Sequence, residues 1–248
     1  YEKQYTEYMI WKTIIIFPTS VELKEDFMNK AIPKINTQLR SHTILVPEVY
    51  REATGVLING KRIKSLVFST DVAVIANCNA DAVIAVYPFT PTIQITEAII
   101  SVAQRPVFVG VGGGTTAGKR VESIALDAEL HGATAVVLNA PTTTEFVQNL
   151  ADDIDIPVVL TIVSLNEDLE KRMLHTKANI INVSGGKDTV KIVKKLRKID
   201  PNFPIIATGG PTEETVREVI QAGANAVTFT PPTNGEIFKG MMEEYRHR

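Results

Sequence analysis

The feature that most constrains this chain is a series of eight short apolar runs in its last three quarters. The runs are rich in Val and Ile and do not alternate strictly with polar residues, which is typical of parallel strands buried on both faces. They span residues 66–69, 82–87, 107–111, 135–138, 158–163, 180–183, 205–208 and 226–230. Each is followed by a polar stretch of about the length that one strand–helix unit requires.

The stretches between the runs have helical features. The clearest covers residues 212–223, where Thr212 suits the N-cap, Glu213 and Glu214 suit the first turn, and Gly223 suits the stop. Eight such units in succession predict an α/β fold, a (βα)8 TIM barrel over residues 65–248. A doubly wound open sheet is the main alternative, but the chain lacks the glycine fingerprint of dinucleotide binding.

Residues 1–64 form an N-terminal extension with helices and a β-hairpin. Tyr1, Tyr5, Tyr8 and Met9 fall on one face of a predicted helix, and residues 21–40 could form a second helix. Asn59-Gly60 between two short apolar arms predicts the hairpin. We expect this extension to pack on the barrel, either plugging its N-terminal end or building an oligomer contact. The exposed aromatic face favours a homo-oligomer, most simply a dimer.

The amino-acid composition limits which partners, metal sites and cell compartments are expected for the protein. Lys and Arg total 26 against 28 Asp and Glu, and a net charge of −2 gives no reason to expect nucleic acid or an anionic membrane as a partner. The single cysteine, Cys78, excludes an intrachain disulfide framework and a multi-cysteine metal site. We therefore expect a cytoplasmic protein. The longest early apolar run, residues 13–17, is too short to span a bilayer.

In a barrel, chemistry belongs to the loops after the strands, and four of these loops are rich in glycine and hydroxyl residues. Their glycines let backbone N–H groups approach an anion, and the following helix N-termini add a favourable dipole. The predicted binding residues in them are Gly112, Gly113, Gly114, Thr115, Ser184, Gly185, Gly186, Thr208, Gly209, Gly210 and Thr230. The alternative is that these glycines only form tight turns. Residues 112–119 resemble a P-loop superficially, but Arg120 stands where that motif requires a hydroxyl.

Neutral polar residues interrupt otherwise apolar strands. These residues are Thr161, Asn182, Thr208 and Thr228, and Asn139 and Tyr87 end their own strands. If they share the inward face, they line the upper barrel with hydrogen-bonding groups. The alternative is that each satisfies a local backbone group.

No predicted barrel strand contains Asp, Glu, Lys, Arg or His. A strand-borne Schiff-base lysine and a metal site built on strand ends are therefore both unexpected, and we predict no metal and no cofactor. Only loop residues then remain for general acid–base catalysis. The candidate catalytic residues are Lys187, Asp71 and Glu236. Asp71 could equally cap the helix that follows it, and Lys187 could be a solvated surface residue.

The segments 204–210, Pro-Ile-Ile-Ala-Thr-Gly-Gly, and 222–227, Ala-Gly-Ala-Asn-Ala-Val, carry a resemblance to a known family. They resemble the phosphate-binding (βα)8 barrels of the aldolase and ribulose-phosphate-binding type. The Gly-Gly-Gly-Thr-Thr, Ser-Gly-Gly-Lys-Asp and Thr-Pro-Pro-Thr set also resembles bacterial barrel proteins of unsettled function. Where such families place Gly-Ser or Gly-Thr after the eighth strand, this chain has residues 229–233, Phe-Thr-Pro-Pro-Thr.

Two classes of function follow. The first is a metal-independent lyase or isomerase acting on a small phosphorylated or carboxylated metabolite. In it Lys187 would bind or polarise the substrate, Asp71 or Glu236 would move a proton, and Asn139 and Asn182 would orient the substrate. The second is a non-catalytic barrel that binds a phosphorylated metabolite and regulates another process.

Overall fold

The computed structural model describes residues 33, 35, 37–38 and 42–247. The chain divides into two compact units, Tyr1–Ser41 and His42–Arg248, and the second contains the barrel. The two helices predicted before residue 41 lie outside the described residues, as does nearly all of the first unit.

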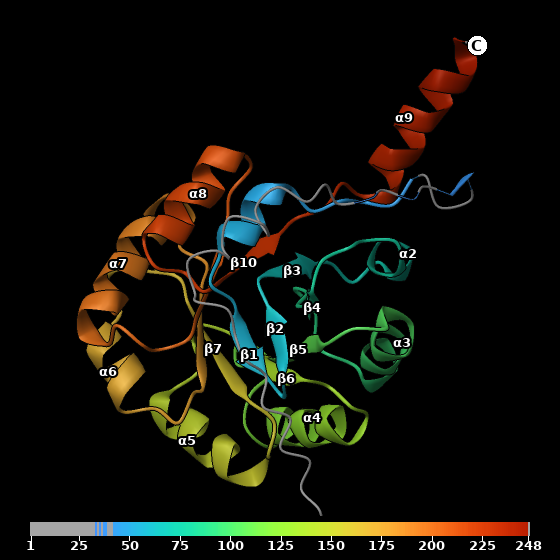
Figure 1. Ribbon diagram of the computed structural model, residues 1–248. Coiled ribbons are helices and arrows are strands. Elements are labelled where there is room, and N and C mark those ends of the chain that lie inside the picture. The colour runs from blue at the N-terminus through green and yellow to red at the C-terminus, as the bar shows by residue number, and fades with distance from the viewer. Residues whose placement is uncertain (1–32, 34, 36, 39–41, 248) are drawn as a thin grey trace, which may run out of the picture. The chain divides into compact units, whose positions relative to one another are not determined.

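All eight predicted runs form strands, and the strands close into one parallel barrel (Figure 1). They are β3 (Ser65–Phe68), β4 (Ala82–Ala85), β5 (Val107–Gly112), β6 (Ala135–Leu138), β7 (Val158–Ile162), β8 (Ile180–Val183), β9 (Ile205–Thr208) and β10 (Ala226–Phe229). The strands follow one another around the barrel in chain order, and β10 pairs with β3 to close it. The predicted (βα)8 barrel is confirmed.

One α-helix lies in each of the seven connections between successive barrel strands, and an eighth follows the last strand. They are α2 (Val72–Ala76), α3 (Ile93–Ala103), α4 (Lys119–Leu130), α5 (Thr144–Asp153), α6 (Leu169–Leu174), α7 (Thr189–Ile199), α8 (Glu213–Gln221) and α9 (Asn234–Arg246). The Thr212 hydroxyl accepts a hydrogen bond from Thr215 N and caps α8, as its sequence predicts. Gly223, which follows the end of α8, has φ +112°, a conformation that favours glycine.

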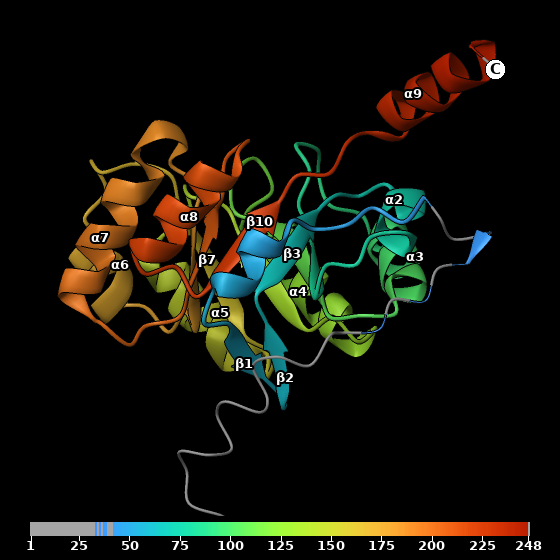
Figure 2. The same ribbon diagram turned by 45° about the horizontal axis from the view of Figure 1, so that its top comes forward.

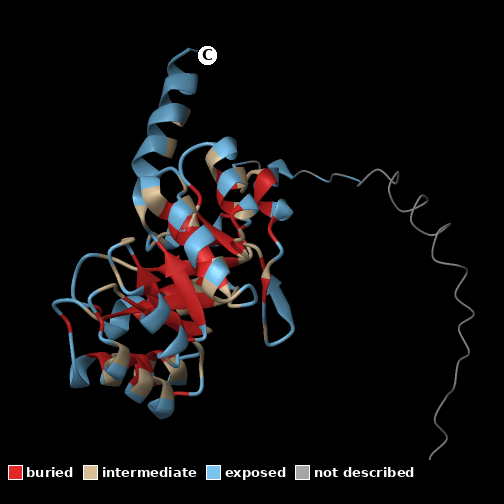
Figure 3. Ribbon diagram, turned by 90° about the vertical axis from the view of Figure 1, so that its left-hand side faces the viewer, coloured by how far each residue is buried: buried red, intermediate tan, exposed pale blue. Residues whose placement is uncertain are grey.

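The strands are buried on both faces because two apolar clusters meet at the barrel wall (Figure 3). The outer cluster joins strand residues such as Val83, Val109 and Leu160 to the helices. The inner cluster joins residues such as Leu66, Phe108 and Ile206 inside the barrel. This double burial explains why the runs are continuously apolar.

A hairpin covers the N-terminal end of the barrel. It consists of β1 (Val56–Ile58) and β2 (Lys61–Ile63), and its turn holds Asn59 and Gly60 at φ +47° and +79°, as the Asn-Gly pair predicts. Figure 2 shows the hairpin, labelled β1 and β2, at one end of the barrel. Its Val56 and Ile63 are buried in the inner cluster. The hairpin therefore packs on the inner cluster. The plug and oligomer-contact roles expected of the extension stay predictions.

A short helix that the sequence did not predict covers the barrel wall between α8 and α2. The short 3-10 helix η2 (Glu48–Glu52) packs against α8, and its Val49 and Tyr50 are buried with Val67 and Val227 of the closing strands (Figure 1). No residue of α9 is buried. Within the described residues, no helix is both long and apolar enough to cross a membrane.

Candidate functional site

The carboxyl ends of the strands surround a cavity of about 290 Å³, which we call the mouth cavity. Its polar lining comes from Asn139, Thr161, Asn182, Ser184, Thr208, Thr228 and Thr230, and its apolar lining from Phe68, Ile84, Val86 and Val163. Thr161, Asn182, Thr208 and Thr228 all line this cavity, in keeping with the first of the two alternatives considered for them. The reason is strand alternation, which places them one step above the apolar inner cluster.

Strand register sets these side chains beside one another. Thr161 of β7 pairs with Asn182 of β8, and Thr208 of β9 pairs with Thr228 of β10. Asn182 Nδ2 donates a hydrogen bond of 3.3 Å to Thr161 Oγ1. Asn182 is 8% exposed, and its Oδ1 is buried without a hydrogen-bond partner among the described residues.

A second cavity of about 300 Å³ adjoins the first, because Val86 and Asn139 line both. Gly112, Gly114 and Thr115 of the loop after β5 form one wall of it, and the loop after β4 forms another. In that second loop, the Tyr87 hydroxyl accepts a hydrogen bond of 2.9 Å from Thr92 N. Phe89 of the same loop is 77% exposed and is not among the residues predicted for the site. Its only signal in the sequence is an aromatic residue between Pro88 and Pro91, directly after a strand.

A third cavity of about 420 Å³ lies beside β9 and β10. Thr208, Gly210 and Thr230 line it together with Tyr50 of η2 and Phe229. The Tyr50 and Phe229 rings meet edge to face, with centroids 5.8 Å apart. Burial raises the pKa of Tyr50 to about 12, so its phenol stays neutral at physiological pH.

A fourth cavity, of about 780 Å³, is an open groove outside the barrel. Its lining comes from α5, α6 and the residues around them, including Glu145, Lys171 and His175. It shares no lining residue with the mouth cavity, so it is set apart from the strand ends at which barrels carry their chemistry.

The loop after β5 packs tightly against the loop after β6. Gly113 has φ +106°, and a Cβ there would lie 1.9 Å from Thr142 Oγ1. Thr142 Oγ1 in turn donates to Gly113 O at 3.3 Å. Gly113 therefore serves loop packing, whereas Gly112 and Gly114 line the second cavity.

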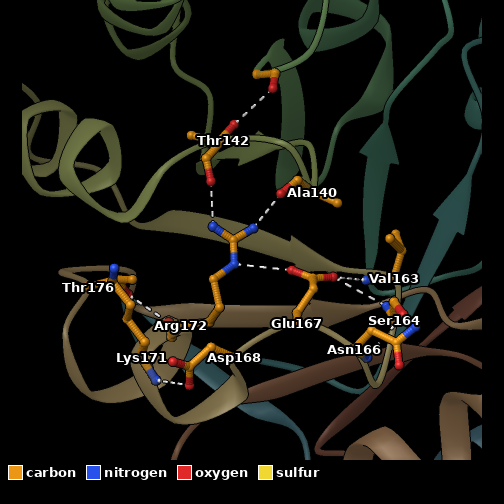
Figure 4. A network of polar contacts seen from close by, with 11 residues as sticks. Ala140, Thr142, Val163, Ser164, Asn166, Glu167, Asp168, Lys171, Arg172 and Thr176 are labelled. Atoms are coloured by element: carbon orange, nitrogen blue, oxygen red, sulfur yellow. Dashed lines mark hydrogen bonds and ion pairs between the residues drawn. The ribbon is translucent and has the colours of Figure 1, made fainter.

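A buried arginine joins two of the loops at the rim (Figure 4). Arg172 of α6 donates from Nη1 to Thr142 O and from Nη2 to Ala140 O, and its Nε forms a 3.1 Å ion pair with Glu167. Glu167 Oε1 accepts from the backbone of Val163 and Ser164. This network fixes the loops that carry Asn139 and Val163, and no local pattern in the sequence predicts it.

The three residues predicted to be catalytic do not line the mouth cavity. Lys187 lies exposed in the short 3-10 helix η3 (Gly186–Asp188), which precedes α7. Asp71 Oδ1 accepts from Ala73 N and Val74 N and so caps α2, which is the alternative weighed for it. Glu236 Oε2 accepts from the backbone and hydroxyl of Thr233 at 2.7 and 2.8 Å, and these bonds lower its pKa. The structure does not bring these three residues together.

Only some residues of the glycine-rich loops predicted to bind an anion line the mouth cavity. Ser184 and Thr208 line the mouth cavity, but Gly185, Gly186 and Gly209 do not. The Gly185 N–H already donates to Thr189 Oγ1 at 3.1 Å. At the start of α8, Glu214 accepts hydrogen bonds from its own backbone N–H and from Thr212, which lowers the pKa of its carboxyl. A carboxylate thus lies at one of the helix N-termini that follow the glycine-rich loops, and anion binding at these loops stays a prediction.

No family model matches the chain, and no curated protein matches its sequence. Solved structures match its fold. One is 2,3-dimethylmalate lyase, a PEP mutase/isocitrate lyase superfamily member, at TM-score 0.54 and 14% identity over 87% of this chain and 88% of that one. Another is phosphoenolpyruvate phosphomutase from Streptomyces platensis subsp. rosaceus, at TM-score 0.55 and 12% identity over 80% and 83%. A third is dihydrodipicolinate synthase from Rhodopseudomonas palustris, at TM-score 0.53 and 13% identity over 79% and 78%. At identities this low, the similarity concerns the fold alone. Together with the closed eight-stranded sheet, it shows that the chain folds as an aldolase-type (βα)8 barrel.

Proposed function

We propose that this chain is a lyase or isomerase that binds a small phosphorylated or carboxylated metabolite in the mouth cavity and needs no metal ion. The observation that supports this most is the ring of neutral hydrogen-bonding side chains around that cavity. The ring lies at the carboxyl ends of the strands, where barrel enzymes hold their substrates.

The lining is suited to chemistry in which negative charge develops on a substrate oxygen. Hydroxyl and amide groups held in a cavity stabilise such charge because they are already oriented when the reaction begins. The Thr208 and Thr228 hydroxyls and the Asn139 amide can donate hydrogen bonds of this kind. These residues would bind and orient the substrate and favour an enolate-like transition state.

A proton donor is also required, and Tyr87, which lines the adjoining cavity, is a candidate. Its hydroxyl accepts a bond from Thr92 N, which leaves the phenolic proton to be donated. Asp71 and Glu236 stay predictions for this role, and each would first have to release its helix N-terminus. Lys187 stays a prediction as the partner of the anionic group.

The similar structures are those of a lyase, a phosphomutase and a synthase, and this supports a lyase-type reaction for this chain. One observation favours a second function, non-catalytic binding of a metabolite. Every polar residue that lines the mouth cavity is a neutral Asn, Ser or Thr, whereas general acid–base catalysis usually relies on ionisable groups.

One experiment separates the two functions. The chain is incubated with single phosphorylated and carboxylated three- to six-carbon metabolites, with and without EDTA, and turnover and binding are followed by NMR. We expect turnover that survives EDTA, and we expect Tyr87→Phe to lower kcat by about 10²-fold or more with little change in KM. Binding without turnover supports the non-catalytic function. Turnover that EDTA abolishes contradicts metal independence, and binding of no metabolite contradicts both functions.

A further inference from the structure

A buried phenol lines the third cavity without a hydrogen-bond partner. Tyr50 is 4% exposed, and its Oη forms no hydrogen bond with the described residues. Tyr50 Oη is not one of the unpaired side-chain atoms that are sealed from solvent, so a group in this cavity of about 420 Å³ can reach it. Because buried polar atoms are nearly always paired, an unpaired and reachable phenol in a cavity points to a ligand group that bonds to it.

The phenol lies where a ligand in the mouth cavity could extend. Tyr50 belongs to η2, outside the barrel strands, but a Cβ on Gly209, directly after β9, would lie 3.3 Å from Tyr50 Oη. Thr208 and Thr230 line both the third cavity and the mouth cavity. The two cavities therefore adjoin at the carboxyl ends of β9 and β10, and one ligand can occupy both.

The lining of the third cavity restricts which ligand group Tyr50 can bind. Among the described residues, no lysine, arginine or histidine lines it, and its one carboxyl group is that of Glu213. A second anionic group would be repelled by Glu213 and would lose its hydration against apolar walls such as Val216 and Phe229. An ammonium would offer no acceptor for the phenolic proton. An uncharged oxygen accepts that proton and brings no charge into the cavity.

We propose that Tyr50 Oη donates a hydrogen bond to an uncharged oxygen of the ligand, such as a carbonyl, on an arm that extends from the mouth into the third cavity. This assignment rests on the proposed function, in which the anionic group of the ligand binds in the mouth cavity. The mouth cavity alone, at about 290 Å³, is small for a metabolite site, and the third cavity gives room for the arm. Tyr50 is then a specificity-determining residue that selects an oxo acid over an acid with an apolar or charged end.

Straight-chain acids of five to seven carbons test the assignment, because each carries one carboxylate for the mouth and a variable group at its other end. The three probes 4-oxopentanoate, 5-oxohexanoate and 6-oxoheptanoate end in a methyl ketone at increasing reach. Their counterparts of equal length end in a methyl group, a second carboxylate or an ammonium group. We expect wild type to bind at least one oxo acid about fivefold or more tightly than all its counterparts, as measured by NMR titration, because the counterparts leave the phenol unpaired.

Tyr50→Phe keeps the ring and removes only the hydroxyl. We expect this variant to reduce the preference for the oxo acid to less than about twofold. Tyr245→Phe, the same change at an exposed position on α9, is the matched control and should keep the preference. At neutral pH, Tyr50→Phe should also unfold at about the same urea concentration as wild type, because the hydroxyl bonds to no other part of the chain.

The assignment is overturned if wild type binds the oxo acids and their counterparts equally, if it binds no oxo acid at millimolar concentrations, or if Tyr50→Phe keeps the preference. A clearly lower urea midpoint for Tyr50→Phe at neutral pH would give the phenol a structural role and would overturn it as well. These outcomes are distinct from failure of the proposed function, which is read from turnover. A preference for oxo acids without turnover of any metabolite upholds the role of Tyr50 and removes the enzymatic function.

Discussion

The buried ion pair of Arg172 and Glu167 holds together two of the loops that shape the site. The pair lies 9% and 20% exposed, and Arg172 also bonds the carbonyls of Ala140 and Thr142. A guanidinium can satisfy three acceptors in a fixed fork, which an ammonium cannot. The residue therefore holds two loops in one arrangement beside Asn139.

We expect Arg172→Met to lower the free energy of unfolding by about 3–5 kcal/mol, because it leaves a partly buried carboxylate unpaired. Arg172→Lys should restore only a small part of this loss. Urea unfolding monitored by circular dichroism measures both variants. Lys177→Met breaks the exposed pair with Asp152, and this control should cost no more than about 1 kcal/mol. Equal losses for the Arg172 and Lys177 variants would contradict a special role for Arg172.

Lys187 is the residue on which anion binding at the rim depends. A charge-assisted contact contributes about 1.5–3 kcal/mol, so Lys187→Ala should weaken binding of an anionic ligand by roughly one to two orders of magnitude. Folding should change little, since Lys187 is exposed. Titration calorimetry with a panel of sugar phosphates measures the effect, with Lys194→Ala on α7 as the matched control. Equal affinities for wild type and Lys187→Ala would identify Lys187 as a solvated residue and the glycine loops as plain turns.

The helix η2 covers the strands that close the barrel, and its Tyr50 is buried against them and meets the ring of Phe229. The pKa of this phenol is raised to about 12, against an unfolded value near 10. The folded state therefore holds the proton more tightly. The stability that this provides is complete below pH 10 and is lost as the pH rises from 10 through 12.

Tyr50→Phe should accordingly make stability less sensitive to pH in that range, because phenylalanine has no proton to lose. Urea unfolding at a series of pH values from 8 to 11.5 measures the slope for wild type and variant. Tyr245→Phe, at an exposed position on α9, is the control and should leave the slope unchanged. A wild-type slope retained in Tyr50→Phe would show that other groups cause the alkaline loss.

The helix α9 differs from the other helices that follow barrel strands, since none of its residues is buried. We expect a chain that ends at Thr233 to fold and to unfold with a free energy within about 1 kcal/mol of the full chain, because surface changes seldom cost more. Chemical denaturation at matched concentrations measures this. A loss of several kcal/mol would mean that α9 covers apolar surface in the assembled protein.

The elements that the sequence predicted share a local signal. The eight strands followed from apolar runs, the hairpin from Asn59-Gly60, and the polar mouth from strand alternation at Thr161, Asn182, Thr208 and Thr228. The Arg172 network and η2 were not predicted because they depend on contacts between residues far apart in the sequence. For Asp71 and Glu236, carboxylates next to strand ends suggested chemistry, and only the structure showed both accepting helix N-terminal bonds.

At the scale of the whole molecule, assembly is the main open prediction. The expected homo-oligomer was inferred from Tyr1, Tyr5, Tyr8 and Trp11, which lie outside the described residues. Light scattering at micromolar concentration should give the mass of a dimer, and a monomer mass would overturn the prediction.

The pairing of β10 with β3 has a consequence for how the protein is made. The ladder joins Val227 to Ser65, so the ribosome must synthesise nearly the whole chain before the barrel can close. Until then, β3 and β9 each present an open strand edge, and such edges are templates for aggregation. A stalled or prematurely terminated nascent chain is therefore the form of this protein most in need of a chaperone.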